Sequence, residues 1–209
     1  MKVELIAITR YLRGNGTPEE LLEHAGRVCY RSESRGDPGE FLRARVREGH
    51  ESLIEHASAT FEVSGISRAC SHQLVRHRLA SYSQESQRYV SMSDPAWVLP
   101  SAVAENAEAG AIWEGFAAEV RRTYRALREL GIHKEDARFA LPNAAATRIV
   151  VTMNFRQLLH VFRIRISREA QWEIRDVCVR MLELVFPLAP AVFGDLRDEL
   201  RARHPDFFG

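Results

Sequence analysis

The stretch ASATFEVSGISRACSHQLVRHRLASYSQESQRY, residues 57–89, changes its pattern twice and so predicts three consecutive parts of the fold. Its first eight residues alternate apolar and polar side chains, which is typical of a half-buried strand. From Ile66 to Leu74 the apolar residues recur every four positions, which predicts a short helix capped by Ser64 or Ser67. The last fourteen residues, RHRLASYSQESQRY, leave the end of this helix. We expect them to form a loop with a rigid base on one side.

The rest of the chain predicts few strands and many helices. We expect the first helix to bury Val28 and Cys29, and the long central helix to bury Ile112, Phe116 and Leu130. The expected strands are residues 2–9 and 147–153, and the expected helices are residues 18–31, 37–49, 102–130, 133–140, a segment capped by Asn154, 167–186 and 195–203. Because strands and helices do not alternate regularly, the sequence predicts an α+β fold, a small sheet packed by several helices. Residues 1–209 are expected to form a single domain.

Composition narrows the class of protein. The chain has 209 residues, 45% of them hydrophobic, and a formal net charge of +1. A module that binds nucleic-acid backbone usually has a clear basic excess, so the charge disfavours that class. Cys29, Cys70 and Cys178 lie in apolar helical patterns and predict reduced core thiols. The N-terminus is too short and too charged for a signal peptide, and no apolar run reaches the ~20 residues that span a bilayer. We therefore expect a cytoplasmic protein without a membrane partner.

The stretch from Arg76 to Tyr89 is dense in directed hydrogen-bonding groups. Arginine presents a planar fork of donors that fits phosphate, and serine, glutamine and tyrosine add shorter partners. An anionic, nucleotide-like ligand is the favoured interpretation, and a solvated or ion-paired turn stays open as an alternative. Ser86 and His77 could be a nucleophile and its base, but no GxSxG elbow accompanies them. A nucleic-acid-binding module that uses residues 76–88 is the alternative function.

Two familiar motifs are absent. Gly14-Asn15-Gly16 follows a strand without the third glycine of a dinucleotide-binding turn, and no GxxxxGK[ST] loop is present. The segment from His50 to His56 resembles a zinc-protease helix, but Ile54 stands where the second histidine would have to be. The sequence therefore predicts neither a Rossmann crossover nor a metal site.

Four separate segments resemble the flavin-dependent thymidylate synthases. Arg76-His77-Arg78, seven residues and then Ser86 match the RHR-x7-S signature of that family. The other three segments lie on both sides of it and extend the resemblance over roughly residues 45–180. They are His50-Glu51-Ser52 with Glu55-His56, Ala137-Arg138-Phe139-Ala140-Leu141-Pro142, and the C-terminal series Asn154-Phe155-Arg156, His160, Arg165 and Ala170-Gln171-Trp172-Glu173-Ile174.

The resemblance implies a specific reaction. Enzymes of this family are methyltransferases that convert dUMP to dTMP, in dTMP biosynthesis. They take the one-carbon unit from methylenetetrahydrofolate and the reducing hydride from NADPH through bound FAD. The family fold is α+β, and its members are homotetramers whose flavin sites are shared between subunits.

The resemblance also assigns roles residue by residue. It implies that flavin is contacted by Ser52, Arg76, His77, Arg78, Gln84, Asn154, Phe155, Arg156 and His160. It implies that dUMP is held by Gln73, Arg76, Gln84, Glu85, Ser86, Gln87, Arg88, Arg138 and Arg165. Arg165 matches the catalytic residue that favours ionisation of the pyrimidine. Gln84 and His160 stand where some relatives have Glu and Asn, and we expect these differences to tune the site without abolishing it.

Overall fold

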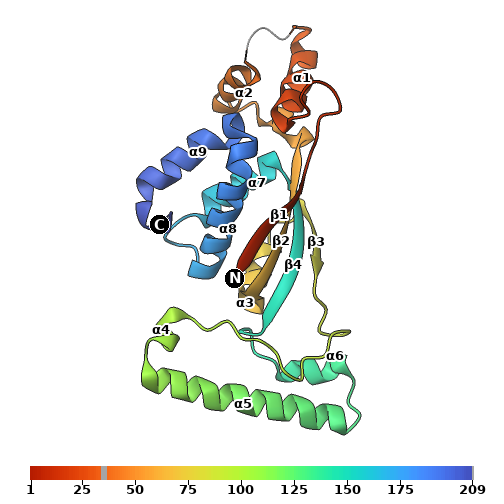
Figure 1. The fold of residues 1–209 in the computed structure, drawn as a ribbon, viewed down its shortest axis with the longest axis vertical. Helices are drawn as coiled ribbons and strands as arrows, with labels where there is room; N and C mark the ends of the chain where they lie inside the picture. Colours follow the sequence, from red (N-terminus) through yellow and green to blue (C-terminus); the bar gives the residue numbers. More distant parts are fainter. Residues whose placement is uncertain (34–36, 209) are drawn as a thin grey trace.

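A four-stranded antiparallel sheet lies at the centre of the molecule. The computed structural model describes residues 1–33 and 37–208. Its sheet has the order β1-β2-β4-β3, formed by β1 (Lys2–Ile8), β2 (Ser58–Ser67), β3 (Ala80–Gln84) and β4 (Ala146–Asn154). The predicted α+β fold with a small sheet and several helices is confirmed (Figure 1).

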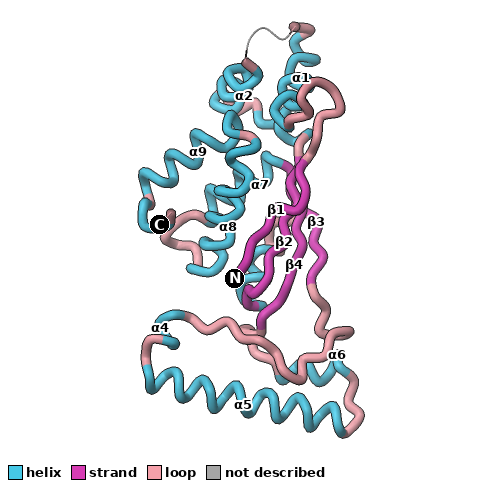
Figure 2. Tube along the Cα trace, viewed as in Figure 1, coloured by secondary structure: helices cyan, strands magenta, loops and turns pink. Residues whose placement is uncertain are grey.

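The helices form three groups around this sheet (Figures 1 and 2). One group covers a face of the sheet, one lies at one end of it, and one forms a separate layer at the opposite end. The first group is α7 (Phe155–Arg165), α8 (Trp172–Val185) and α9 (Pro190–Arg203); the second is α1 (Pro18–Tyr30) and α2 (Pro38–Arg47); the third is α4 (Ser101–Ala104), α5 (Ala107–Glu129) and α6 (Lys134–Ala137). The remaining helical segments are α3 (Arg68–Leu74) and the 3₁₀ turns η1 (Glu51–His56), η2 (Arg138–Ala140), η3 (Phe186–Leu188) and η4 (Pro205–Phe207).

Strand β2 connects the core to the helix that carries the arginine-rich segment. Its alternation is as predicted, with Phe61 and Val63 fully buried. Gly65 has a φ of +67°, a conformation that glycine adopts without strain, and the pairing with β4 shifts register between Ser64 and Ile66. After this bulge Ser67 caps α3 by accepting a hydrogen bond from the backbone N–H of Cys70 at 3.0 Å, which confirms one of the two predicted caps.

The prediction of a loop after α3 is wrong for residues 80–84. These residues form β3, which pairs antiparallel with β4, so that Ala80 lies opposite Met153 and Gln84 opposite Ile149. The alternation is weak in the sequence. Ser81 and Ser83 are exposed, and the residues between and beside them are Ala80, Tyr82 and Gln84, of which the glutamine is not typical of the buried face of a strand. The hydroxyl of Tyr82 lies 2.8 Å from the carbonyl oxygens of both Leu74 and His77, and so fixes the turn between α3 and β3.

Two predicted buried faces are exposed in the structure. On α1, Val28 is 64% exposed and Cys29 is exposed, because the helix buries its Leu22 and Gly26 face, where a Cβ on Gly26 would lie 2.8 Å from the ring of Phe41. The prediction of a core thiol is therefore wrong for Cys29. It is confirmed for Cys70 and Cys178, and burial raises the pKa of both thiols, that of Cys178 to about 12.

The long helix predicted at residues 102–130 is two helices. Asn106 interrupts it and caps α5, with its Oδ1 accepting from the N–H of Ala109 at 3.0 Å. Ile112 is 68% and Leu130 79% exposed, and Phe116 is also exposed. The prediction that these three are buried is wrong because α5 lies in the layer away from the sheet (Figure 1). Its buried Tyr124 packs only in a small cluster with Met92 and Ala137.

Two C-terminal helices begin at positions other than those predicted. Helix α8 starts at Trp172 instead of Ser167, because the side chain of Gln171 caps it by accepting from the N–H groups of Glu173 and Ile174 at 3.0 and 3.3 Å. Helix α9 starts at Pro190 instead of Asp195. A proline is tolerated in the first turn, because backbone N–H groups there make no hydrogen bond within the helix. No helix in the described ranges is long and apolar enough to cross a membrane.

Glu173 should be a major determinant of stability, because it joins α8 to the N-terminus of α3. It is 2% exposed and accepts from the backbone N–H and the hydroxyl of Ser67 at 2.6 and 2.5 Å. We expect Glu173→Gln to lower the free energy of unfolding by about 2 kcal/mol, since hydrogen bonds to charged groups contribute roughly 1.5–3 kcal/mol. Urea denaturation followed by circular dichroism measures this change.

The matched control is Glu199→Gln, which breaks an exposed pair with Arg203 one helical turn away. Such pairs contribute only about 0.5 kcal/mol. Equal destabilisation by the two variants would contradict the role of Glu173.

Candidate functional site

The end of α7 meets the turn that follows α3. Arg165 donates from Nε to Nε2 of His77 at 3.0 Å and from Nη2 to the carbonyl oxygen of Gln73 at 3.3 Å. These residues come from segments about ninety positions apart, and all three were predicted site residues. Helices α3 and α7 start at opposite ends of the antiparallel pair β2–β4, since Ser67 lies opposite Ala146 and Asn154 opposite Ser58. They meet at their C-terminal ends, where Arg165 is the last residue of α7 and His77 follows α3.

His77 is neutral in this arrangement. Burial, followed by the positive charges of Arg165 and His160, lowers the pKa of His77 to about 4. Since Nε2 accepts from the Arg165 guanidinium, the ring proton is on Nδ1. A histidine in this state orients the arginine without neutralising its charge.

Gln84, at the end of β3, is fixed by two hydroxyl groups. Its Nε2 donates to Oγ of Ser71 at 2.8 Å and to Oγ1 of Thr147 at 3.3 Å. Ser71 and Thr147 are both buried, on α3 and β4 respectively. The side chain of Gln84 therefore has a defined place where α3 meets the sheet.

A basic hollow of about 350 Å³ lies beside α3. It contains two predicted nucleotide ligands, Gln87 and Arg138, beside Arg68 and His72. Arg68 is half-buried; burial and the charge of Arg138 lower its pKa, while Glu85 opposes this effect. Sequence reasoning missed Arg68 and His72, although their (i, i+4) spacing on the predicted helix next to Gln73 could have indicated them.

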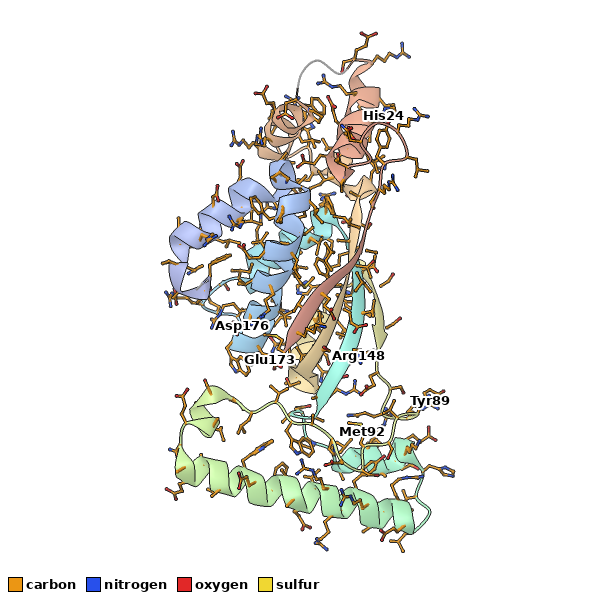
Figure 3. All side chains as sticks on the ribbon, in the orientation of Figure 1. His24, Tyr89, Met92, Arg148, Glu173 and Asp176 are labelled. Atoms are coloured by element: carbon orange, nitrogen blue, oxygen red, sulfur yellow. The ribbon has the colours of Figure 1, made fainter. Side chains whose placement is uncertain are left out.

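Arg88 and Arg138 converge on the same short helix. Arg88 Nε lies 3.0 Å from a carboxylate oxygen of Glu135, and Arg138 Nε donates to the carbonyl oxygen of Glu135 at 3.0 Å. Lys134 donates to the carbonyl oxygen of Tyr89 at 2.7 Å, which places the end of the arginine-rich segment against α6, where Figure 3 shows Tyr89 between the sheet and α5. Ser86 Oγ accepts from the backbone N–H of Arg88 at 3.2 Å.

A second hollow, of about 450 Å³, collects predicted flavin ligands. It is lined by Asn154, Arg156 and His160 at the start of α7, by Leu79 from the segment before β3, and by the carboxylates of Glu51 and Glu55. Arg156 pairs with Glu55 at 2.5 Å. Cationic, amide and imidazole donors beside an aliphatic side chain suit a group with a pyrophosphate and an apolar ring, so this donor set fits FAD.

The predicted site residues differ in how much of their side chain is available. Ser52, Arg76, Arg78 and Glu85 are exposed. Phe155 is fully buried, with its ring 5.0 Å from that of Phe193, so only its backbone could contact a ligand. In the part of the chain that the structure describes, the two hollows have no lining residue in common, and neither of them collects all the predicted residues.

Comparison with known proteins now decides the family. The family model described as thymidylate synthase complementing protein matches residues 10–191. The chain belongs to this family. The protein named flavin-dependent thymidylate synthase from Geobacter sulfurreducens is 47% identical over 189 residues, which cover 85% of this chain and 82% of the relative. The protein of the same name from Nitratidesulfovibrio vulgaris is 43% identical over 215 residues, covering 92% and 85%.

A solved structure has the same fold. The flavin-dependent thymidylate synthase of Helicobacter pylori, in complex with FAD and dUMP, superposes with a TM-score of 0.75 at 24% identity and covers 93% of this chain and 99% of its own. The predicted fold of the family is confirmed by this likeness.

The neutral state of His77 predicts a dependence of stability on pH. An unfolded histidine takes up its proton near its ordinary pKa of about 6.5, whereas folded His77 does so only near a pKa of about 4. Between these values the unfolded state binds more protons, so the free energy of unfolding should fall as the pH is lowered from about 6.5 to about 4.

We expect His77→Gln, which cannot titrate, to flatten this part of the profile. Urea denaturation at a series of pH values provides the measurement, with His24→Gln on the surface of α1 as the control for loss of a histidine. A profile for His77→Gln as steep as that of the wild type would contradict the assignment.

Proposed function

We propose that this protein is a flavin-dependent thymidylate synthase. It methylates dUMP to dTMP reductively, with methylenetetrahydrofolate as carbon donor and NADPH as reductant through FAD. The observation that carries the proposal is the contact of Arg165 with the RHR segment, at His77, in a chain that belongs to this family. The matched relatives support an enzyme and give no support to the nucleic-acid-binding module.

The nucleotide phosphate is bound by arginines of the site, among them Arg88 and Arg138. A phosphate dianion takes several guanidinium forks, and each charge-assisted hydrogen bond contributes roughly 1.5–3 kcal/mol. The convergence of Arg88 and Arg138 on α6 supports their role as phosphate ligands. The other residues proposed to hold dUMP are Gln73, Arg76, Gln84, Glu85, Ser86, Gln87 and Arg165.

Arg165 acts on the pyrimidine ring. A guanidinium is permanently charged and cannot serve as a base near neutral pH, but it stabilises an anion that develops on the uracil ring. The neutral imidazole of His77 and the carbonyl of Gln73 hold the guanidinium while leaving its charge for the substrate. This electrostatic role requires only correct placement.

FAD would be held mainly at the start of α7. Asn154, Arg156 and His160 line the hollow there, and we assign Ser52, Arg76, His77, Arg78, Gln84 and the backbone of Phe155 to the same cofactor. When bound, the flavin supplies the hydride chemistry that no protein side chain provides. The chain contributes binding, orientation and charge.

We extend the proposal to the assembly. The protein acts in the cytoplasm as a homotetramer with flavin sites shared between subunits. Each chain forms one domain over residues 1–209. Exposed Arg76 and Arg78, and two hollows with separate linings, support a site that needs a second chain.

The decisive experiment is the formation of dTMP by the purified protein. We expect it to require dUMP, methylenetetrahydrofolate, NADPH and FAD, each shown by leaving one out. Oxidation of NADPH without any need for dUMP would instead identify a flavin reductase and refute the proposal.

Arg165→Ala should abolish turnover while the binding of nucleotide or flavin partly survives. Removing one group that stabilises developing charge lowers the rate by roughly a hundredfold to a thousandfold. The measurement is dTMP formation together with flavin absorbance of the purified variant. Arg168→Ala, three residues on and paired with Asp206 at the surface, is the matched control. Unchanged dTMP formation in Arg165→Ala would refute the assigned role.

Ser86→Ala should keep measurable activity. Ser86 is a hydrogen-bonding ligand whose hydroxyl also receives the N–H of Arg88, and the loss of one such bond lowers the rate by up to about tenfold. The same assay tests it. A variant that is folded and loaded with flavin but fully inactive would show that Ser86 is an obligatory nucleophile.

A further inference from the structure

The hydrogen bonds around Gln84 determine which end of its amide faces the ligand. Ser71 is fully buried and Thr147 is 5% exposed, and both hydroxyls lie within hydrogen-bonding distance of the same nitrogen, at 2.8 and 3.3 Å. The amide is thus held against the sheet from one side. Its other side carries the carbonyl oxygen, in a residue that the proposed function assigns to the site.

The proton of Ser71 is already used. Its Oγ donates to the carbonyl oxygen of Arg68 at 3.0 Å, inside α3. A hydroxyl has one proton, so Ser71 can only accept from Gln84. The amide must therefore turn its NH₂ group toward Ser71, and this network, not the shape of the amide, fixes its orientation.

The carbonyl oxygen of Gln84 consequently points away from both hydroxyls. Among the hydrogen bonds of residues 1–33 and 37–208, no group donates to this oxygen. Both amide protons have partners, and the remaining function is one acceptor at the edge of β3. The ligand atom that meets it has to be a donor.

We propose that Ser71 and Thr147 are positioning residues that make Gln84 accept a hydrogen bond from an N–H or O–H group of the bound nucleotide. This inference rests on the proposed function, because it deepens the role of a residue assigned there to the site. The same network distinguishes Gln84 from a glutamate at this position. A carboxylate would also present an acceptor, but it would require Ser71 to release the carbonyl of Arg68.

The test is a double-mutant cycle on the affinity of the flavin-loaded protein for dUMP, measured by titration calorimetry. We expect Ser71→Ala to weaken binding by about fivefold to tenfold, the value of one neutral hydrogen bond. In a Gln84→Met background, where no amide remains to be oriented, Ser71→Ala should have no further effect. An equal loss in both backgrounds would show a purely structural role for Ser71 and overturn the proposal.

Thr147 provides an independent arm that leaves α3 intact. Thr147→Val removes the hydroxyl and keeps the shape, whereas Thr147→Ser keeps the hydroxyl. We expect weaker dUMP binding for the valine variant and wild-type affinity for the serine variant. Wild-type affinity in both Thr147→Val and Ser71→Ala would overturn the proposal.

Two nucleotide analogues identify the donor. One lacks the 3′-hydroxyl of dUMP and the other is methylated at N3 of the ring. The effect of Gln84→Met should disappear for the analogue that has lost the donor. An equal effect for dUMP and both analogues would overturn the assignment of the donor to the nucleotide. Absence of dUMP binding by the wild-type protein would instead refute the proposed function itself.

Discussion

The hydrogen bond from Arg165 to His77 is the contact on which the proposed site depends. It forms only if the imidazole is neutral, because a protonated ring would have no acceptor and would repel the guanidinium. The surroundings enforce the neutral form, since burial and two nearby cations lower the pKa of His77 to about 4. It also forms only if the last residue of α7 reaches the turn after α3. Because β2 and β4 are antiparallel, with Ser67 opposite Ala146 and Asn154 opposite Ser58, α3 and α7 start at opposite ends of this strand pair and approach each other at their C-terminal ends. This one contact of 3.0 Å therefore needs both a neutral His77 ring and a fold that brings the end of α7 to the turn after α3.

Three further contacts fix α3, the short helix that ends just before this histidine. Glu173 holds the first turn of α3 through Ser67, Tyr82 holds the last turn and the carbonyl of His77, and Gln84 reaches back to Ser71 in the middle. These contacts come from α8 and β3, both outside the helix itself. An isolated helix of seven residues has little stability of its own. The position of His77 is therefore determined by tertiary structure, and the buried polar groups involved must keep their partners, because leaving one unpaired is unfavourable.

Sequence reasoning succeeded where the local pattern determines the structure, and it failed where packing does. The alternation in β2 and the caps at Ser67 and Asn154 were predicted correctly, because a period of two and a side-chain cap depend on near neighbours. Strand β3 was missed because pairing with β4, not its own hydrophobicity, makes it a strand. Ile112 was placed in the core because its spacing suits a buried face, yet α5 has little to bury it against. In the site, the motif indicated His77 and Arg165 as separate ligands, but their mutual contact, and the place of Arg68 beside Arg138, follow only from the fold.

The distribution of ion pairs explains how a chain of net charge +1 can contain a site for anions. At the start of α7 the cations are balanced, since Arg156 pairs with Glu55 and Arg163 with Glu51. Around α3 the balance is different: within the described residues, Arg68, Arg138 and Arg165 have no carboxylate within ion-pair distance. Arg68 also has its pKa lowered by burial and by Arg138, the condition under which a bound anion relieves repulsion as well as adding attraction. The positive potential therefore arises around α3 from arginines that lack a carboxylate partner among the described residues, and the total charge of the chain gives no indication of it.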